Sequence, residues 1–399
     1  MNAAIKIDWC GRKRTLFMSA IIPPSVGALL SVVARILSPM TVLLAIGTSK
    51  GLFLATSGNR ADWEVSGPHF PMTSIYAVGI DRRRAAPRLL VGVDSSHFGP
   101  SVATSDDLGQ TWSEPDAAPV AFPADTDTSL VRVWQLAPGP ESEPDVVYAG
   151  TQPSALFRSD DGGRTFTLVR PLWDHPHRPD WGAGFGGQAI HTILPHPADP
   201  ARVLVAMSTG GVYRTSDGGE SWSPGNAGIR AGFFPDPFPE FGQCVHKVAR
   251  DAGDPTRLYA QNHGGVYRSD DEGATWSSIA EGLPSDFGFP IVTHPAKPAT
   301  LWTFPLSADS HRFPPDHRCR VFRSTDAGDS WQALSAGLPT EPFYPTVLRD
   351  AMCTDNATPG GVYFGTRSGE VWSSRDEGES WVRVAAHLPD VLSVKAAEL

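Results

Sequence analysis

Four polar residues recur at matched positions of two short segments. Gln188 and His191 stand in the run Gly-Gln-Ala-Ile-His, and Gln243 and His246 stand in the run Gly-Gln-Cys-Val-His, 55 residues further on. An imidazole can accept or donate a proton near neutral pH, and a primary amide can donate and accept hydrogen bonds. We therefore predict that His191 and His246 are catalytic and that Gln188 and Gln243 bind a ligand. The alternative is that all four bond only water or neighbouring backbone.

Acidic residues supply a second kind of chemistry. Cleavage of a glycosidic bond needs two carboxyl groups, one protonated as the acid and one acting as nucleophile or base. The carboxylates that stand in long connecting segments are Asp174, Asp180, Asp236, Glu240, Asp309 and Asp316. Their types alone select no pair, and we name Asp180 and Glu240 as the catalytic candidates.

Basic and aromatic residues complete the predicted ligand site. They are Arg132, His175, His177, Trp181, His317 and Arg318. A guanidinium can pair with an anionic group of a ligand, and an aromatic ring offers a flat apolar face on which a sugar can stack. For the aromatic residues the alternative is that they hold long loops onto the rest of the fold.

Histidine and aspartate also raise the question of a metal ion. His175, His177, Asp180 and His191 fall within 17 residues, and imidazole with carboxylate is ordinary zinc chemistry. No C-x-x-C or H-E-x-x-H spacing accompanies them, so we predict no metal ion and no other cofactor. An enzyme that uses His191 and His246 as metal ligands stays open as an alternative.

A repeated eight-residue template must position these residues. It reads S/T-x-D-x-G-x-S/T-W/F and occurs six times without a gap, with central residues Asp107, Asp161, Asp217, Asp271, Asp326 and Asp376, which are 54, 56, 54, 55 and 50 residues apart. The carboxylate can accept N–H bonds across a tight hairpin, and the glycine can adopt a positive φ. A degenerate seventh copy runs from Thr56 to Trp63, with Gly58 in place of the aspartate. A fixed period of this size predicts a propeller or solenoid, in this chain of four-stranded units.

These hairpins resemble Asp-box or BNR repeats, and from about residue 41 onward the chain resembles the sialidase-type β-propellers. The resemblance is strongest to bacterial BNR-repeat proteins labelled glycosyl hydrolase or exo-alpha-sialidase. It implies an all-β propeller with glycoside hydrolase-like activity, and hairpins that lie away from the catalytic face. Sialidases also carry a Phe/Tyr-Arg-Ile-Pro motif near the first blade, where this chain reads Leu-Leu-Ala-Ile-Gly-Thr from Leu43.

The two ends of the chain are predicted to share one blade. The first unit has strands near Val42 to Gly47, Gly51 to Thr56 and Asp62 to Val65 but none before them, whereas one further β-rich run follows the last unit. We predict that Leu392 to Lys395 forms the innermost strand of the first blade. Residues 41–399 would then form a single seven-bladed β-propeller without long open sheet edges.

Three connections are longer than strand pairing requires, namely residues 170–189, 223–243 and 306–318. We expect them to wall a concave site on one face of the central channel. His191 and His246 should occupy equivalent positions on the inner strands beneath these loops. Arg132 and Tyr76 should stand in the same column of earlier blades.

Residues 1–40 read differently from the rest of the chain. Basic residues 12–14 precede an uncharged run to Ala34, the order of a signal peptide, while Pro23-Pro24 argues against that reading and against a membrane-spanning helix. The other interpretation is a start codon placed too far upstream, with Met40 as the first residue. We predict a cytoplasmic protein without stable membrane insertion, with export through a signal peptide in residues 1–34 as the alternative.

Composition limits the partners. The 39 glycines and 37 prolines exclude a helical bundle, and 33 basic against 43 acidic side chains give a formal net charge of −10, which argues against a nucleic-acid partner. Cys244, Cys319 and Cys353 are predicted to be three separate buried thiols. We expect a monomer that binds a small-molecule or glycan ligand. A non-catalytic binding or assembly propeller is the alternative function.

Overall fold

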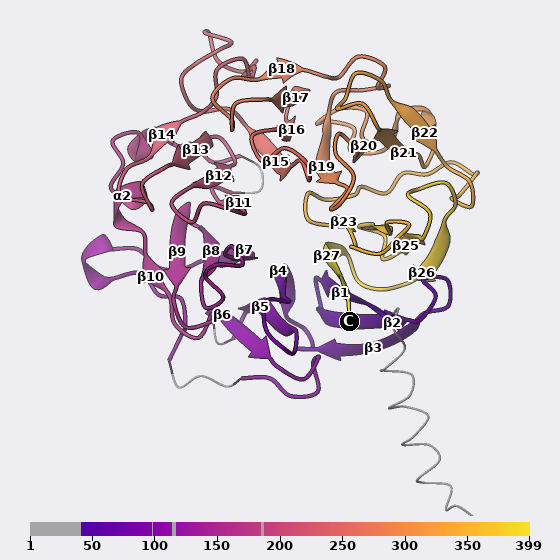
Figure 1. The fold of residues 1–399 in the computed structure, drawn as a ribbon, viewed down its shortest axis with the longest axis horizontal. Coiled ribbons are helices and arrows are strands. Elements are labelled where there is room, and N and C mark those ends of the chain that lie inside the picture. The colour runs from indigo at the N-terminus through magenta and orange to yellow at the C-terminus, as the bar shows by residue number, and fades with distance from the viewer. Residues whose placement is uncertain (1–40, 98, 114–116, 185–186) are drawn as a thin grey trace, which may run out of the picture. The chain divides into compact units, whose positions relative to one another are not determined.

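Seven β-sheets are arranged as blades around one axis (Figure 1). The computed structural model describes residues 41–97, 99–113, 117–184 and 187–399, so the expectations for residues 1–40 lie outside the described residues. The blades form one compact unit, Met40–Leu399. No helix within the described ranges is long and apolar enough to cross a membrane.

Each blade is an antiparallel sheet whose strands follow one another outward from the axis. From the inside out, blade 1 holds β27 (Val391–Glu398), β1 (Val42–Thr48), β2 (Gly51–Ser57) and β3 (Glu64–His69); blade 2 holds β4 (Ser74–Asp81), β5 (Arg88–Ser95) and β6 (Gly99–Ser105); blade 3 holds β7 (Arg132–Pro138), β8 (Val147–Gln152), β9 (Ala155–Ser159) and β10 (Thr167–Leu168). In the same order, blade 4 holds β11 (Ile190–Pro195), β12 (Val203–Met207), β13 (Gly211–Thr215) and β14 (Ser223–Pro224); blade 5 holds β15 (Val245–Arg250), β16 (Leu258–Asn262), β17 (Gly265–Ser269) and β18 (Ser277–Ser278). Blade 6 holds β19 (Gly288–Thr293), β20 (Leu301–Pro305), β21 (Val321–Ser324) and β22 (Gln332–Leu334); blade 7 holds β23 (Met352–Thr354), β24 (Val362–Gly365), β25 (Val371–Ser374) and β26 (Val382–Ala385).

Short helices occur only in connections within the described ranges. They are η1 (Ala124–Thr126), α2 (Arg170–Trp173), η2 (Arg178–Asp180) and η3 (Pro315–His317). The all-β, seven-bladed prediction is therefore confirmed. Blade 2 shows three strands; a fourth would follow Trp112, and residues 114–116 there lie outside the described ranges.

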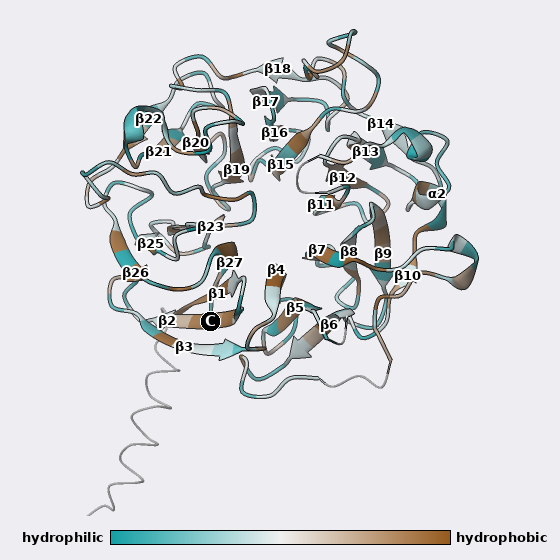
Figure 2. Cartoon of the chain, turned by 180° about the vertical axis from the view of Figure 1, so that it is seen from behind, coloured by the Kyte–Doolittle hydropathy of each residue, from teal (hydrophilic) through white to brown (hydrophobic). Residues whose placement is uncertain are grey.

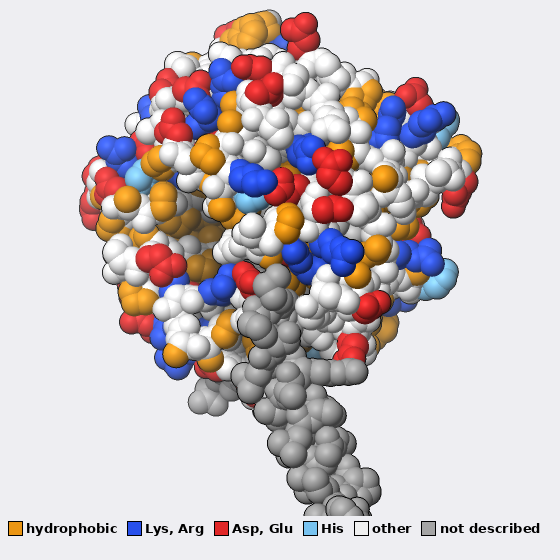
Figure 3. All heavy atoms as spheres, turned by 45° about the vertical axis from the view of Figure 1, so that its right-hand side comes forward, with side chains coloured by type: hydrophobic (Ala, Val, Ile, Leu, Met, Phe, Trp, Pro, Cys, Tyr) orange, Lys and Arg blue, Asp and Glu red, His pale blue; other side chains and the backbone are white. Residues whose placement is uncertain are grey.

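Inner and outer strands differ in how deeply their side chains are buried. All seven residues of β1 and all five of β12 are buried, as expected for strands covered on both faces, whereas five of the six residues of β3 are exposed. Hydrophobic residues accordingly concentrate on inner strands such as β27, β4 and β15 in Figure 2. On the surface shown in Figure 3, basic and acidic side chains are interspersed.

The ring is closed by the C-terminal strand, as predicted. β27 pairs with β1 along its length, from Val42 opposite Glu398 to Thr48 opposite Val391, and the two strands lie side by side in Figure 1. Arg60 of blade 1 also donates a hydrogen bond to the carbonyl oxygen of Pro359 in blade 7, at 2.6 Å. Both ends of the chain thus contribute strands to one sheet.

The six repeat hairpins have the hydrogen bonds that their composition predicts. In the first, Asp107 accepts bonds from the backbone N–H of Thr111 at 2.9 Å and from its hydroxyl at 2.6 Å. The hydroxyl of Ser105 donates to Asp107 at 2.8 Å and accepts the N–H of Gly109, whose φ is 87°. The same pattern recurs at the other five aspartates.

The degenerate copy in blade 1 differs from the prediction by one residue. Asn59, rather than Gly58, occupies the place of the aspartate, because its side-chain oxygen accepts the N–H groups of Ala61 and Asp62 at 2.9 Å. Ser57 takes the place of the template serine and accepts the N–H of Arg60 at 2.8 Å. A neutral amide therefore forms this turn, and the predicted alignment from Thr56 was wrong.

Candidate functional site

Bulges in the inner strands aim side chains at the axis. The pairing of the inner strand with its neighbour shifts by one residue at Tyr76, Trp134, His191, His246 and Leu392, and an irregularity in β19 contains Phe289. A bulge re-directs a side chain that regular pairing would place in the sheet face. In blade 3 this position is held by Trp134, so the prediction that Arg132 stands in the His191 column was wrong by two residues.

The axis holds a cavity of about 400 Å³ to which all seven blades contribute. Its lining residues are Tyr76, Trp134, Gly184, Ser208, Thr209, Phe233, Cys244, His246, His263, Phe289, Asp309, Arg312, Leu348, Arg349, Asp350, Arg367 and Leu392. Of the six residues at irregular positions named above, five line the cavity and only His191 does not. Aromatic rings and charged groups therefore face one space large enough for a small ligand.

Long connections form part of the cavity wall. Each of the three predicted loops contributes: Gly184 comes from residues 170–189, Phe233 from 223–243, and Asp309 and Arg312 from 306–318. A fourth connection, residues 335–351 between β22 and β23, contributes Leu348, Arg349 and Asp350. The length of this connection could have marked it as part of the site, but the sequence analysis did not include it.

Three arginines line the cavity, and they differ in their partners. Arg312 forms an ion pair with Asp309 at 2.5 Å, and Arg367 forms one with Asp390 at 2.6 Å. Arg349 has no ion pair or hydrogen bond from its side chain among the described residues; its guanidinium lies over the Trp134 ring, 5.2 Å from the centroid. Burial lowers the pKa of Arg349, although a guanidinium stays charged at neutral pH.

An ion pair crosses the axis. Lys247 of blade 5 donates a hydrogen bond to Asp350 of blade 7 at 2.6 Å, and both side chains are buried. Lys395 of blade 1 lies 3.8 Å from the same carboxylate. Three blades are thus tied together through Asp350, which also lines the cavity.

His246 is the one predicted catalytic residue that lines the cavity. Its Nδ1 lies 2.6 Å from the carbonyl oxygen of Gly288, which can only accept, so Nδ1 carries the hydrogen and Nε2 keeps a free lone pair. Nε2 lies 3.7 Å from Sγ of Cys244. Burial, with a smaller effect of Arg349, lowers the pKa of His246 to about 3, so the ring is neutral at physiological pH.

His191 has a different environment. It is fully buried, its Nε2 donates to the carbonyl oxygen of Val245 at 2.9 Å, and its Nδ1 lies 3.2 Å from the Thr192 hydroxyl. Burial lowers its pKa well below the usual range. Both ring nitrogens are therefore engaged, and the ring stands outside the cavity lining as a link between blades 4 and 5.

The two predicted glutamines hold backbone rather than the cavity. Gln188 donates to the carbonyl oxygen of Trp181 at 2.6 Å, and Gln243 donates to that of Pro239 at 2.6 Å. Gln243 is fully buried, and its side-chain oxygen has no hydrogen-bond partner among the described residues. Each amide fixes the loop that precedes its inner strand.

The predicted carboxylate pair lies on the loop surface. Asp180 and Glu240 are exposed, and neither lines the cavity. The carboxylates that do line it are Asp309 and Asp350, and only Asp309 stood among the loop candidates predicted from the sequence.

His175, His177 and Trp181 gather around Tyr213, away from the cavity lining. Trp181 donates its indole hydrogen to the Tyr213 hydroxyl at 2.9 Å, which lies 3.0 Å from Nδ1 of His177. The His177 ring stacks on Phe241 with 4.1 Å between centroids, and His175 lies 4.6 Å from His177. These contacts fit the alternative reading, in which the aromatic residues hold loop 170–189 down.

The three remaining predicted ligand contacts also lie outside the cavity lining. Arg132 pairs with Asp94 at 2.7 Å, and its guanidinium lies 4.0 Å from the centre of the Tyr76 ring, so it supports a cavity residue. His317 and Arg318 are exposed, and the His317 ring packs against Tyr344 at 4.7 Å.

Comparison with curated proteins finds relatives that are named xyloglucanases. No protein-family model matches the chain. A xyloglucanase of Paenibacillus sp is 26% identical over 277 residues, which are 61% of this chain and 25% of that protein. A xyloglucanase of Hypocrea jecorina (strain QM6a) is 25% identical over 297 residues, or 64% of this chain and 32% of that protein. The chain thus spans between a quarter and a third of the length of these relatives.

Among solved structures, an ancestral GH74 enzyme superposes with a TM-score of 0.50 at 18% identity, covering 78% of this chain and 38% of that one. This likeness concerns the fold. The chain is a seven-bladed propeller with glycoside hydrolase relatives, and the finer resemblance to sialidases stays a prediction.

Proposed function

We propose that this protein is a glycoside hydrolase-like propeller that binds a carbohydrate in the cavity on its axis. The proposal depends above all on the cavity itself, which measures about 400 Å³, is lined by residues of all seven blades and combines aromatic faces with charged groups. The xyloglucanase names of the curated relatives support carbohydrate as the ligand class.

The rings of Trp134, Tyr76 and Phe233 supply surfaces on which a sugar ring can stack. Ser208 and Thr209 bring hydroxyl groups to the same wall. A pocket that combines apolar faces with a few convergent polar groups suits a small ligand better than a broad protein surface.

Arg349 favours a sugar that carries a negative charge. It is the cavity arginine without an ion pair among the described residues, and a carboxylate of the ligand would supply one. A uronic acid or another carboxylated sugar is therefore the preferred ligand.

The ion pairs of both cavity carboxylates favour a second candidate, a binding propeller without turnover. Asp309 is held by Arg312, and Asp350 is held by Lys247. Hydrolysis requires one carboxyl group to act as a proton donor and a second to act as nucleophile or base, and each cavity carboxylate is already engaged by a basic side chain. The catalytic roles of Asp180 and Glu240 remain predictions, and the turnover assay described below tests them.

Calorimetric titration with a uronate-containing oligosaccharide and with a neutral xyloglucan oligosaccharide tests the proposal. We expect tighter binding of the acidic ligand, and we expect Arg349→Gln to weaken it at least about tenfold because one charged partner is lost. Arg383→Gln, on the outer strand β26, is the matched control and should bind as the parent does.

Release of new reducing ends by the parent protein separates the two candidates. Turnover lost in Asp309→Asn, Asp180→Asn or Glu240→Gln identifies a hydrolase and its carboxylate. Binding without turnover identifies the non-catalytic propeller. Equal binding of the acidic ligand by the parent and Arg349→Gln proteins, or no carbohydrate binding at all, would overturn the cavity as the site.

A further inference from the structure

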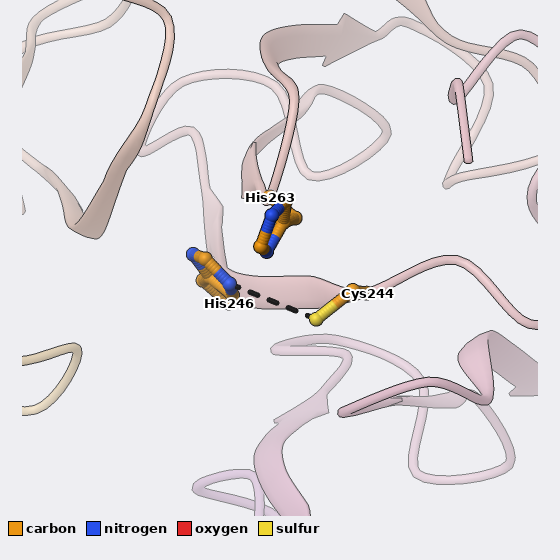
Figure 4. Close-up of side chains that lie close together, drawn as sticks. All are labelled: Cys244, His246 and His263. Carbon is orange, nitrogen blue, oxygen red and sulfur yellow. Dashed lines mark hydrogen bonds between the residues drawn. The ribbon is translucent and has the colours of Figure 1, made fainter. Parts of the chain in front are cut away.

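We propose that Cys244, His246 and His263 bind one zinc-type transition-metal ion at the wall of the axial cavity. Sγ of Cys244 and one ring nitrogen of each histidine lie within 4.8 Å of one another. Figure 4 shows the three side chains pointing toward one another, Cys244 and His246 from one segment and His263 from another. The inference is independent of the carbohydrate proposal.

The separation of the first two ligand atoms fits a shared ion. Sγ of Cys244 and Nε2 of His246 are 3.7 Å apart. Two such atoms on one tetrahedral zinc ion stand about 3.5 Å apart, given Zn–S near 2.3 Å and Zn–N near 2.0 Å. An ion can therefore lie between them with only a small adjustment of the side chains.

His246 is already prepared as a ligand. The carbonyl oxygen of Gly288 fixes the hydrogen on Nδ1 at 2.6 Å and leaves Nε2 unprotonated toward Cys244. Metal-bound histidines characteristically donate their second N–H to a backbone carbonyl or carboxylate in this way.

His263 is free to complete the set. Its ring packs edge-on against His246, with centroids 5.6 Å apart, and no hydrogen bond from its ring nitrogens is found within the described ranges. Its backbone N–H donates to the carbonyl oxygen of Cys244 at 2.9 Å, so the two residues face each other across the start of the β15–β16 pair. Its ligand nitrogen lies within 4.8 Å of the other two ligand atoms, so a modest movement of the side chain would let it bind the same ion.

Blade 4 provides an internal comparison. There the N–H of Ser208 donates to the carbonyl oxygen of Ala189, and the bulge residue is His191. The same backbone thus carries alanine, histidine and serine where blade 5 carries cysteine, histidine and histidine. In blade 4 the His191 ring bonds to Val245 and Thr192 instead. The ligand set is therefore a feature of blade 5 and does not follow from the repeat.

The chemistry of binding is a simple exchange. The thiol of Cys244 gives up its proton to solvent as sulfur coordinates the ion. All three residues line the cavity, so the fourth position of a tetrahedral ion would face it. Three protein ligands and one open position are the arrangement of zinc sites that bind or activate a ligand.

Cobalt(II) titration of the untagged, reduced, metal-stripped protein tests the proposal. We expect one equivalent to bind with the visible bands of tetrahedral cobalt and a near-ultraviolet thiolate-to-cobalt charge-transfer band, and zinc to displace it. Cys244→Ser should abolish the charge-transfer band. His263→Gln should weaken binding at least about 10-fold, because losing a ligand costs no less than losing an outer-sphere partner, which is about 10- to 100-fold.

Cys319→Ser is the matched control, because Cys319 is also buried but lies outside the cluster, and it should bind cobalt as the parent does. Circular dichroism and melting temperature establish that each variant is folded. Absence of stoichiometric cobalt binding by the parent, or an unchanged spectrum and affinity in folded Cys244→Ser, overturns the proposal. The Cys244 thiol would then only donate a weak hydrogen bond to His246.

Discussion

The aspartate of each repeat hairpin accepts hydroxyl and amide hydrogens and takes no part in the axial cavity. Hydrogen bonds from the Thr111 hydroxyl, the Thr111 N–H and the Ser105 hydroxyl lower the pKa of Asp107 to about 2. At Asp161, burial raises the pKa, but the Thr165 hydroxyl and N–H outweigh it and leave it at about 2. These carboxylates are thus adapted to accept hydrogen bonds in their ionised form.

A pH-dependent stability difference follows for Asp107→Asn. A carboxylate with a depressed folded pKa stabilises the fold above its unfolded pKa near 4, and this contribution is lost as the pH falls through about 2. The variant should therefore melt below the parent at pH 7, and the gap should shrink between about pH 4 and pH 2. Glu281→Gln removes the same charge from an exposed site as a control. A gap that is constant with pH would contradict this account of the hairpin.

Single residues of the site were harder to predict than the hairpins. The template aspartates recur in one local pattern, so their chemistry is readable from eight residues. Arg349 and His263 belong to no repeated motif. Their roles depend on side chains that are distant in sequence, such as Trp134 beside Arg349 and Cys244 beside His263. The opposite error occurred at His191. The residues around it match those around His246, and each ring bonds to a backbone carbonyl of the next blade, yet only His246 lines the cavity.

At the scale of elements, bulged inner strands and long connections together build the cavity wall. The connections could be predicted from their lengths, because strand pairing needs only a few residues between strands. The bulges could not, since alternation of side chains assumes regular pairing. This is why Arg132 was placed in the column that Trp134 occupies.

Two phenylalanines on loop 223–243 provide a test at this scale. Phe233 is 52% exposed and lines the cavity, whereas Phe238 is 57% exposed and does not. Phe233→Ser should weaken carbohydrate binding about 3- to 10-fold through loss of a stacking face, and Phe238→Ser should not. Neither change should alter the melting temperature, because neither ring is buried. Equal effects of the two substitutions on calorimetric affinity would argue against a ligand that reaches this loop.

For the whole molecule, the decisive feature is a sheet made from both ends of the chain. The surplus strand at the C-terminus and the missing strand at the N-terminus made this closure predictable. Within blade 1, Ser393 approaches Gly47 so closely that a Cβ at residue 47 would stand 2.3 Å from its hydroxyl oxygen. Such contact indicates a sealed ring rather than a loosely attached tail.

Removal of residues 390–399 should therefore destabilise the entire propeller. Val391, Leu392 and Val394 are buried, and burial of each side chain contributes about 1.5–3 kcal/mol, so we expect a loss of about 4.5 to 9 kcal/mol in the free energy of unfolding. Denaturant unfolding followed by tryptophan fluorescence measures it, and a peptide of residues 388–399 added in trans should restore part of the loss. A truncated protein that unfolds with the parent's midpoint and cooperativity would refute closure by β27.

A crystal structure with a bound uronate-containing oligosaccharide tests the central claim most directly. The account predicts sugar density on the axis, with a ring against Trp134 and a carboxylate paired with Arg349. Sugar bound instead around His177 and Tyr213, or on the outer hairpins with the cavity filled only by solvent, would contradict it.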